Sequence, residues 1–335
     1  MRVALNGYGR IGRSFLRALL DRSAEGGWSL PFELVAINDL GRPQDLLYLT
    51  QYDSTHGRAG TPAALVDGCL QVGPLAPKLL CEPSPAALPW RELEVDLVLE
   101  CTGVWRGREG AGQHLHAGAQ RVIIGAVPFE PVDALTVYGI NHSELGDARI
   151  LSAASCTTHA IAPLLLALHQ AWQVEQVIMT EVHAYTSDQT LLDHVHRDPR
   201  RGRAAAQNIV PTTSSAIGAI QQVLPWLAGR ISGGSIRVPT LNVAMVDLTL
   251  KLAQTPSVDA VNALFAARAG DAPWQIGYND APLVSVDFNH RAESVIFDAT
   301  QTEIQGDLVR VVGWYDNEWG YAQRLLDLVS HLSGA

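Results

Sequence analysis

The chain has 335 residues, of which 47% are hydrophobic, and a formal net charge of −10. This length is ample for a large core and is typical of about two domains. An acidic chain with scattered Lys and Arg offers no basic surface for nucleic acid or an anionic membrane. No stretch has the roughly 18 apolar residues of a membrane-spanning helix, and the first residues lack the pattern of a secretion signal. We therefore expect a cytoplasmic protein.

The 4 cysteines are spread along the chain at Cys69, Cys81, Cys101 and Cys156. They form no Cys-x-x-Cys pair and lack the density of a disulfide framework. We expect free thiols in a reducing compartment, no disulfide and no metal site.

The sequence opens with a motif that is typical of dinucleotide binding. An apolar strand pattern at residues 2–5 is followed by Gly7, Gly9 and Gly12 and by a helical pattern at residues 11–22. Glycines with this spacing allow a tight turn, close approach of the backbone to a pyrophosphate, and close packing of helix on strand. The helix N-terminus then faces the anion. A plain glycine turn is the alternative, which the position between a strand and a helix disfavours.

A second strand pattern, at residues 32–37, ends at Asp39. A carboxylate there accepts hydrogen bonds from the adenosine ribose hydroxyls and repels a 2′-phosphate, which favours NAD over NADP. Further strand patterns at residues 95–100, 121–124 and 135–139 alternate with a helical pattern at residues 110–118. This alternation predicts a parallel sheet with helices on both faces.

The pattern changes after Cys156. A strongly apolar helix is predicted at residues 160–172. Longer strand patterns then cluster, which indicates an antiparallel or mixed sheet in a second domain. They cover residues 176–183, 235–238, 242–252, 283–288 and 309–315. Residues 184–209 form a long, arginine-rich segment, whose length indicates a functional loop. Residues 319–332 carry the apolar spacing of an amphipathic helix.

Three residues are candidates for chemistry. Cys156 lies just before a predicted helix, where the dipole favours the thiolate, but a thiol with a free pKa of about 8.5 also needs a nearby base. His183, at the end of the next strand, is a candidate base, or else a polar strand-end histidine. Arg237 lies within an apolar strand run, where a half-buried cation needs an anion, either a ligand or a local carboxylate. A nucleophilic thiol beside a dinucleotide site indicates oxidation of an aldehyde through a thioester.

Several blocks of the sequence resemble the glyceraldehyde-3-phosphate dehydrogenase family, which includes erythrose-4-phosphate dehydrogenase. The blocks are residues 155–158, 183–189, 200–204, 237–243 and 314–321, and the resemblance runs from Val3 to about Leu328. It implies an α/β protein with a Rossmann-type NAD-binding domain at residues 1–155 and 319–335. Residues 156–318 are then an α+β catalytic domain with a mostly antiparallel or mixed sheet. The resemblance also implies a homotetramer in which the long loop lines a neighbour's cofactor site.

The resemblance further implies catalytic roles. Cys156 is the nucleophile that attacks the aldehyde carbon, and His183 activates the thiol and acts as the base during hydride transfer. Thr186 and Arg237 match the site for the substrate's own phosphate, with Asp188 nearby. The site for the attacking inorganic phosphate is matched by Ser155, Thr157, Ser214 and Ser215.

The NAD contacts implied by the resemblance fall into two groups. The first surrounds the glycine turn, where Arg10 and Ile11 meet the pyrophosphate, and the ends of the early strands. Its members are Gly7, Gly9, Arg10, Ile11, Gly12, Asp39, Thr102 and Gly103. The second is Asn317, which matches the position that binds the nicotinamide amide.

The chain departs from the family pattern beside the nucleophile. His159 and Ala160 stand where the family usually has Asn and Cys. Ser214 and Ser215 replace the usual Thr-Gly of the attacking-phosphate site, which adds a side chain where the backbone approaches an anion. We therefore expect reduced phosphate affinity.

The favoured hypothesis is phosphorylating oxidation of glyceraldehyde 3-phosphate with NAD, through a thiohemiacetal and a thioester on Cys156. An erythrose-4-phosphate dehydrogenase is the first alternative, because residues 101–104, 287–290 and 300–302 look more like that enzyme. A catalytically weak relative that binds metabolites is the second. A semialdehyde dehydrogenase is disfavoured by the well-matched phosphate blocks.

Overall fold

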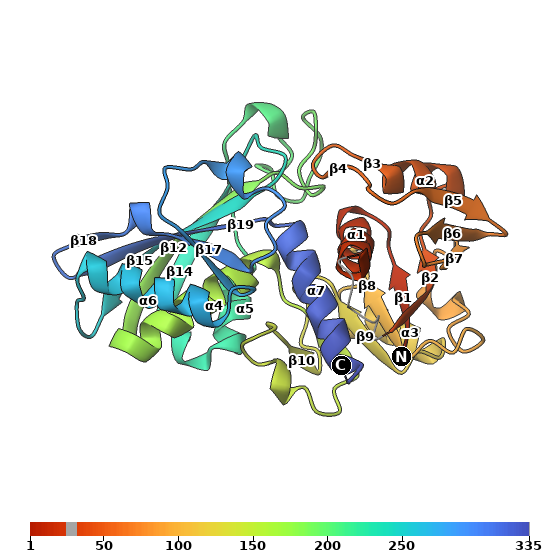
Figure 1. Ribbon diagram of the computed structural model, residues 1–335, viewed down its shortest axis with the longest axis horizontal. Coiled ribbons are helices and arrows are strands. Elements are labelled where there is room, and N and C mark those ends of the chain that lie inside the picture. The colour runs from red at the N-terminus through yellow and green to blue at the C-terminus, as the bar shows by residue number, and fades with distance from the viewer. Residues whose placement is uncertain (25–31, 335) are drawn as a thin grey trace. The chain divides into compact units, whose positions relative to one another are not determined.

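The computed structural model describes residues 1–24 and 32–334. The chain divides into two compact units, Met1–Ser155 with Ala322–Ala335, and Cys156–Tyr321 (Figure 1). The sequence-based boundary assigns all of residues 319–335 to the first domain, whereas the structural division falls inside the last helix, α7 (Trp319–Leu332). No helix within the described ranges is long and apolar enough to cross a membrane.

The first unit is built on a 9-stranded sheet with the order β10-β11-β9-β8-β1-β2-β7-β6-β5 (Figure 1). The strands from β10 to β7 are parallel, and β5 and β6 form an antiparallel hairpin at one edge. In chain order they are β1 (Arg2–Asn6), β2 (Glu33–Asn38), β5 (Ala63–Val66), β6 (Cys69–Val72), β7 (Lys78–Leu80), β8 (Leu97–Glu100), β9 (Arg121–Ile124), β10 (Ala134–Leu135) and β11 (Ile150–Ser152). The strand expected at residues 135–139 is thus reduced to the short β10.

The central strands of this sheet are apolar because both of their faces are covered. All four residues of β8 are buried, as are four of the five residues of β1. Helices and a two-stranded ribbon complete the unit. They are α1 (Arg10–Ala24), α2 (Pro43–Gln51), α3 (Arg108–His116), β3 (Tyr52–Asp53) and β4 (Gly57–Arg58).

A buried polar network joins the carboxyl ends of β1, β2 and β8. The Asn6 amide donates to Glu100 Oε2 at 2.5 Å, and the Asn38 amide donates to Asn6 Oδ1 at 2.7 Å. Trp90 Nε1 donates to His114 Nδ1 at 2.9 Å, so the ring proton of the neutral imidazole lies on Nε2, 3.1 Å from Glu100 Oε2. Because each buried group has a partner, the network fixes the strand ends where a nucleotide is expected.

The second unit contains an 8-stranded mixed sheet with the order β13-β14-β12-β15-β19-β17-β16, and β18 pairs with β19. β12 runs parallel to β14 and antiparallel to β15. The strands are β12 (Val174–Ala184), β13 (Val210–Thr212), β14 (Ile231–Val238), β15 (Ala244–Leu252), β16 (Ile276–Asn279), β17 (Val295–Asp298), β18 (Glu303–Gln305) and β19 (Leu308–Tyr315). The helices are α4 (Cys156–Trp172), α5 (Ala216–Val223) and α6 (Val258–Asp271). The apolar α4 packs on β12, β15, β17 and β19.

The strand predicted at residues 283–288 is wrong, because the segment ends in the 3-10 helix η5 (Ser285–Phe288). The Asp287 carboxylate accepts the Val284 backbone N–H at 2.9 Å and closes a turn. Val284 and Val286 are exposed, so the apolar pattern does not mark a buried strand here. Within residues 184–209 the only helix or strand assigned, apart from the end of β12, is the short η3 (Ala205–Gln207), in agreement with the predicted long loop.

The last helix contributes to the core of the first unit from Ala322 onward. Leu325, Leu326 and Val329 are fully buried. Arg22, at the end of α1, donates to Asp327 Oδ1 at 2.6 Å. The greater part of the C-terminal helix thus belongs to the first unit, together with Met1–Ser155.

Candidate active site

Cys156 is the first residue of α4, and the residue as a whole is partly exposed. Its Sγ is 3.7 Å from Nε2 of His183, which is the penultimate residue of β12. Ala154, two residues before the thiol, has a φ of 50°, an uncommon left-handed conformation for a residue other than glycine. A tight turn thus places the start of the helix against the end of the strand, and the structure brings the two predicted catalytic residues together.

The tautomer of His183 follows from its other nitrogen. Nδ1 lies 2.6 Å from the carbonyl oxygen of Ala184, which can only accept a hydrogen bond. Nδ1 therefore carries the ring proton, and the lone pair of Nε2 faces the sulfur. The imidazole is oriented as a base toward the thiol.

A buried carboxylate, which sequence analysis did not select, lies beside this pair. Glu181 is 1% exposed, and its Oε1 is 4.0 Å from His183 Nε2. Oε1 accepts hydrogen bonds from the hydroxyls of Thr157 and Tyr315, the latter at 3.2 Å. Glu181 lies two residues before His183 on β12, so both side chains are on the same face of the sheet. The sequence did carry a sign of this role, because Glu181 occupies a position of the predicted strand that faces the same side as His183.

The charges around the site shift the pKa of each group. Burial, and then the charge of Glu181, raise the pKa of the Cys156 thiol to about 12. Burial, and then Arg237, lower the pKa of His183 to about 4, while Glu181 acts in the opposite direction. Although burial favours a neutral acid, His183 and Arg237 hold the pKa of Glu181 below its ordinary value. These shifts favour a neutral thiol and a neutral imidazole, whereas the dipole of α4 favours the thiolate.

Arg237 on β14 is aligned with His183 in the parallel register of the sheet. Its Nη1 donates a long hydrogen bond of 3.4 Å to the Ala184 carbonyl, and its Nε is buried without a partner among the described residues. A half-buried guanidinium with unused donors is suited to bind an anion. Within residues 1–24 and 32–334 Arg237 forms no ion pair with a carboxylate, and its charge acts on Glu181 from a distance.

The loop residues Thr186 and Asp188, which follow β12, make contacts within the loop. Thr186 is partly exposed, and its backbone N–H donates to Gln189 Oε1 at 2.8 Å. Asp188 pairs with Arg201 at 2.5 Å and lies 3.5 Å from His196 Nε2. Asp188 thus holds the loop together.

The four residues expected at the attacking-phosphate site differ in their exposure to solvent. Thr157 is buried, with its hydroxyl engaged by Glu181 and Tyr315. Ser214 is partly exposed, and its hydroxyl helps to lower the pKa of Glu181. Ser215 is exposed at the start of α5, and Ser155 is partly exposed directly before Cys156.

The substituted His159 is buried on α4, where its ring lies edge-on to Tyr321 with centroids 5.7 Å apart. Ala160 is also fully buried. The departure beside the nucleophile is therefore accommodated in the packing of the helix.

The glycine turn of the first unit fits a dinucleotide. Gly7 has a φ of 94°, and a Cβ there would lie 2.6 Å from the backbone nitrogen of Thr102. A Cβ on Gly12 would lie 2.4 Å from the Gly7 carbonyl oxygen, whereas one on Gly9 would meet nothing within 4 Å. Gly7 and Gly12 thus serve the fold, and Gly9 leaves open space at the start of α1, where an anion is favoured.

Asp39 follows β2 and is partly exposed. Its carboxylate accepts the backbone N–H groups of Tyr8 and Gly41, both at 2.8 Å. Two acceptor oxygens held at a strand end fit ribose hydroxyls. The side chain of Arg10 forms an ion pair with Asp53, so any pyrophosphate contact is left to the backbone of the first turn, with Ile11.

The remaining predicted cofactor residues are Thr102 and Gly103 in the first unit and Asn317 in the second. Thr102 and Gly103 are exposed just beyond β8, and the Thr102 hydroxyl donates to Glu100. Asn317 is 8% exposed in the second unit, and its Oδ1 is buried without a hydrogen-bond partner in the described part of the chain. An unused acceptor of this kind fits a carboxamide donor.

We expect Gly7→Ala and Gly9→Ala to have different effects. Gly7→Ala forces a Cβ into the Thr102 backbone at an unfavourable φ, so we expect it to lower the free energy of unfolding by about 1–3 kcal/mol and to weaken NAD binding. Gly9→Ala has room within the chain, so we expect unchanged stability and weaker NAD binding. Urea unfolding and calorimetric titration with NAD measure both; equal stability of the two variants would contradict this assignment.

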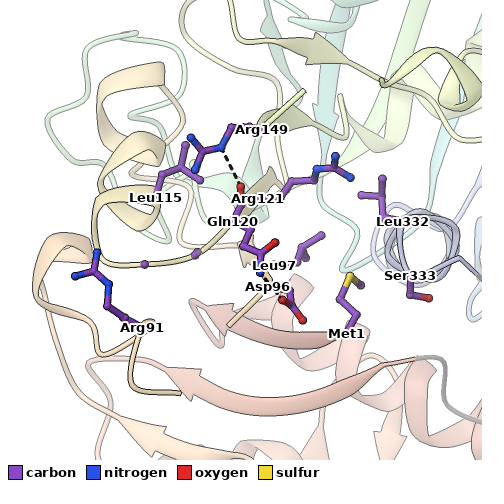
Figure 2. Close-up of a pocket in the computed structure, with 12 residues that line it drawn as sticks. Met1, Arg91, Asp96, Leu97, Leu115, Gln120, Arg121, Arg149, Leu332 and Ser333 are labelled. Atoms are coloured by element: carbon purple, nitrogen blue, oxygen red, sulfur yellow. Dashed lines mark hydrogen bonds between the residues drawn. The ribbon is translucent and has the colours of Figure 1, made fainter. Parts of the chain in front are cut away.

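A separate cavity of about 740 Å³ lies at the amino-terminal ends of β8 and β9 in the first sheet (Figure 2). It is lined by Leu97 and Arg121, the first residues of β8 and β9, and by Arg91, Arg149 and Asp96. Arg149 Nε donates to the Gln120 carbonyl at 3.2 Å, as Figure 2 shows. The predicted NAD contacts lie at the carboxyl ends of the strands instead, so this cavity is not the expected cofactor site.

Comparisons with known proteins cover nearly the whole chain. The NAD binding domain of glyceraldehyde 3-phosphate dehydrogenase matches residues 1–108, and the C-terminal domain of the same family matches residues 155–317. The plasmid-encoded glyceraldehyde-3-phosphate dehydrogenase of Cupriavidus necator is 46% identical, over 100% of this chain and 99% of that protein. The glyceraldehyde-3-phosphate dehydrogenases of Pseudomonas aeruginosa and Xanthobacter flavus are 45% and 43% identical, over 100% and 98% of this chain and 99% and 97% of those proteins. The chain therefore belongs to the glyceraldehyde 3-phosphate dehydrogenase family.

Proposed function

We propose that the protein oxidises glyceraldehyde 3-phosphate to an acyl phosphate with NAD and inorganic phosphate. The observation that carries this proposal is the contact of 3.7 Å between Cys156 Sγ and His183 Nε2, with the tautomer of the imidazole fixed by Ala184. A thiol with an oriented base is the arrangement required for covalent catalysis on an aldehyde. The names of the full-length relatives support the same activity.

In the acylation half, the thiol gives its proton to His183 as the sulfur attacks the aldehyde carbon. A C–S bond forms, and the carbonyl oxygen takes up the proton to give a thiohemiacetal. His183 Nε2 then removes the hydroxyl proton as the carbon is oxidised, which leaves a thioester on Cys156. NAD, when bound, supplies the acceptor for the hydride that leaves this carbon.

In the deacylation half, an oxygen of inorganic phosphate attacks the thioester carbon. The C–S bond breaks, and the sulfur recovers a proton from the imidazolium of His183. We assign the substrate's own phosphate to Arg237 and Thr186, because Arg237 has unused donors. We assign the attacking phosphate to Ser155, Ser214 and Ser215, whose side chains have exposed surface. Asp188 and Thr157 support these groups from the loop and from the interior.

For NAD we assign the pyrophosphate to the turn from Gly7 to Gly12, the ribose to Asp39, and the nicotinamide amide to Asn317. Thr102 and Gly103 border the nucleotide at the end of β8. The fit rests on the open space at Gly9, the strand-end carboxylate and the unpartnered Asn317 oxygen.

We also propose a homotetramer in the cytoplasm. The long loop exposes Leu191 at 77%, Leu192 at 74% and Val195 at 91%, and apolar side chains exposed in this way are typical of a surface that another subunit covers. The described cysteines are all free thiols, which is consistent with a reducing compartment. The mass in solution, measured by light scattering, tests the assembly against the 36.1 kDa of one chain.

Initial rates on two sugar phosphates test the substrate and the deacylation route. We expect faster NADH formation from glyceraldehyde 3-phosphate than from erythrose 4-phosphate, a rate that depends on inorganic phosphate, and a preference for NAD over NADP. Each aldehyde is assayed with and without phosphate, and with each cofactor. A preference for the four-carbon aldehyde with no phosphate dependence would overturn the proposal in favour of hydrolytic oxidation.

A further inference from the structure

We propose that Glu181 is a positioning residue that governs the proton shared by Cys156 and His183, restraining ionisation of the thiol while strengthening the imidazole as a base. The inference rests on the proposed function and concerns the same site. It assigns a role to a buried charge that the chemistry above does not use.

The location of Glu181 is not explained by packing. On β12 its neighbours on the same face are Met179 and Val177, both buried and apolar. A carboxylate in this row pays a large desolvation cost unless it is hydrogen-bonded and balanced by charge. Its Oε1 accepts hydrogen bonds from the hydroxyls of Thr157 and Tyr315, and the hydroxyl of Ser214 also favours its charged form. The fold thus keeps a negative charge at this position although an apolar side chain would pack there without that cost.

The geometry brings this charge close to both reacting groups. Glu181 Oε1 is 4.0 Å from His183 Nε2, and the same nitrogen is 3.7 Å from Cys156 Sγ. Nδ1 already contacts the Ala184 carbonyl, so a proton on Nε2 lies near the sulfur of Cys156 and the carboxylate of Glu181. A negative charge there stabilises the imidazolium and opposes the thiolate.

Three other groups near the site also affect the protonation of Cys156 and His183. Arg237 from β14 has the opposite effect to Glu181 on both Cys156 and His183. Its positive charge favours the thiolate of Cys156 and disfavours the imidazolium of His183. The Tyr315 hydroxyl from β19 is neutral, since burial and Glu181 raise its pKa well above the ordinary value. Glu318 adds a weaker negative charge that favours protonated His183. Glu181 is therefore the buried anion closest to the imidazole among these groups.

This arrangement matters most when the thiohemiacetal is oxidised. The hydroxyl proton moves to His183 Nε2 at that step, and the imidazolium then lies beside the carboxylate, which stabilises it. Glu181 itself neither forms nor loses a covalent bond. The same charge makes the resting thiol less reactive toward other electrophiles. Glu181 therefore makes His183 a stronger base and Cys156 a weaker nucleophile in the resting protein.

The isosteric variant Glu181→Gln tests both halves of the proposal, because they predict opposite changes. Without the charge, we expect Cys156 of the NAD-free protein to react with iodoacetamide roughly tenfold faster at pH 7–8, as for a thiol pKa about one unit lower. We expect kcat for NAD reduction with glyceraldehyde 3-phosphate to fall roughly three- to tenfold, because the base is weaker. Alkylation is followed on the Cys156 peptide by mass spectrometry, with the fold checked by circular dichroism.

Two further variants serve as controls. Glu175→Gln removes the same charge from an exposed position on the same strand, and we expect both rates to be unchanged. Glu181→Asp keeps the charge, and we expect alkylation close to the wild-type rate. A Glu181→Gln protein in which both rates fall together, or neither changes, overturns the proposal. Alkylation requires no aldehyde, so a wild type that fails to oxidise glyceraldehyde 3-phosphate would refute the proposed function while the thiol measurement still decides the role of Glu181.

Discussion

Replacing Cys156 by alanine is expected to lower kcat for NAD reduction with glyceraldehyde 3-phosphate by more than about 10³-fold. The proposed route forms and breaks one bond to this sulfur in every turnover, and loss of a covalent nucleophile typically has effects of this size or larger. NAD binding is expected to persist, because the predicted contacts of the nucleotide do not include the thiol. Initial rates and a calorimetric titration with NAD measure the two properties.

The matched control is Cys81→Ala, because Cys81 is an exposed thiol in the first unit. We expect this variant to keep wild-type activity and to remain sensitive to iodoacetamide. Residual activity of Cys156→Ala within about tenfold of wild type would mean that the oxidation does not pass through a thioester.

The second large effect is expected for His183→Asn, which should lower kcat by about 10²–10⁴-fold, the usual contribution of a general base. The pKa of His183 is lowered to about 4, first by burial and then by Arg237. The imidazole is therefore neutral at pH 7, and it becomes protonated, and is lost as a base, only as the pH falls toward this value. We expect wild-type activity to extend below pH 6.5, the ordinary pKa of histidine, and the acidic limb that His183 causes to be absent from the variant.

His169→Asn is the control for this measurement. His169 belongs to the same unit, where its ring stacks on Trp226 with centroids 3.7 Å apart, and burial lowers its pKa as well. We expect this variant to have the wild-type pH profile. If His183→Asn kept the acidic limb with an unchanged kcat, another group would have to be the base.

The sequence predicted the parts of the site that depend on local pattern. Gly7, Gly9 and Gly12 follow a strand and precede a helix, and the structure gives them the conformations and open space that the spacing indicates. Cys156 and His183 could be selected from the resemblance. Their contact depends on the packing of α4 against the end of β12, which no spacing in the sequence reports.

Glu181 shows why the rest could not be predicted in the same way. A glutamate in a strand is usually solvent-exposed, and the 1% exposure of Glu181 in the folded sheet shows that this one faces inward. The sequence pattern also does not report burial at residues 283–288, where a strand was wrongly predicted. The valines there are exposed, and Asp287 closes a turn. The network of Asn6, Asn38, Glu100 and His114 joins residues far apart in sequence, so its partners also emerge only from the fold.

The division of the chain within α7 has a consequence for biosynthesis. The nucleotide-binding unit is formed by Met1–Ser155 and by Ala322–Ala335, so its first strands leave the ribosome long before the helix that fills its core. Leu325, Leu326 and Val329 are fully buried in the folded protein, and the apolar surface that they cover stays open until α7 has been synthesised. Domains usually fold as units in the order of their synthesis. Here the residues of the second unit are synthesised before α7, so the first unit can complete its core only after most of the second unit has been made.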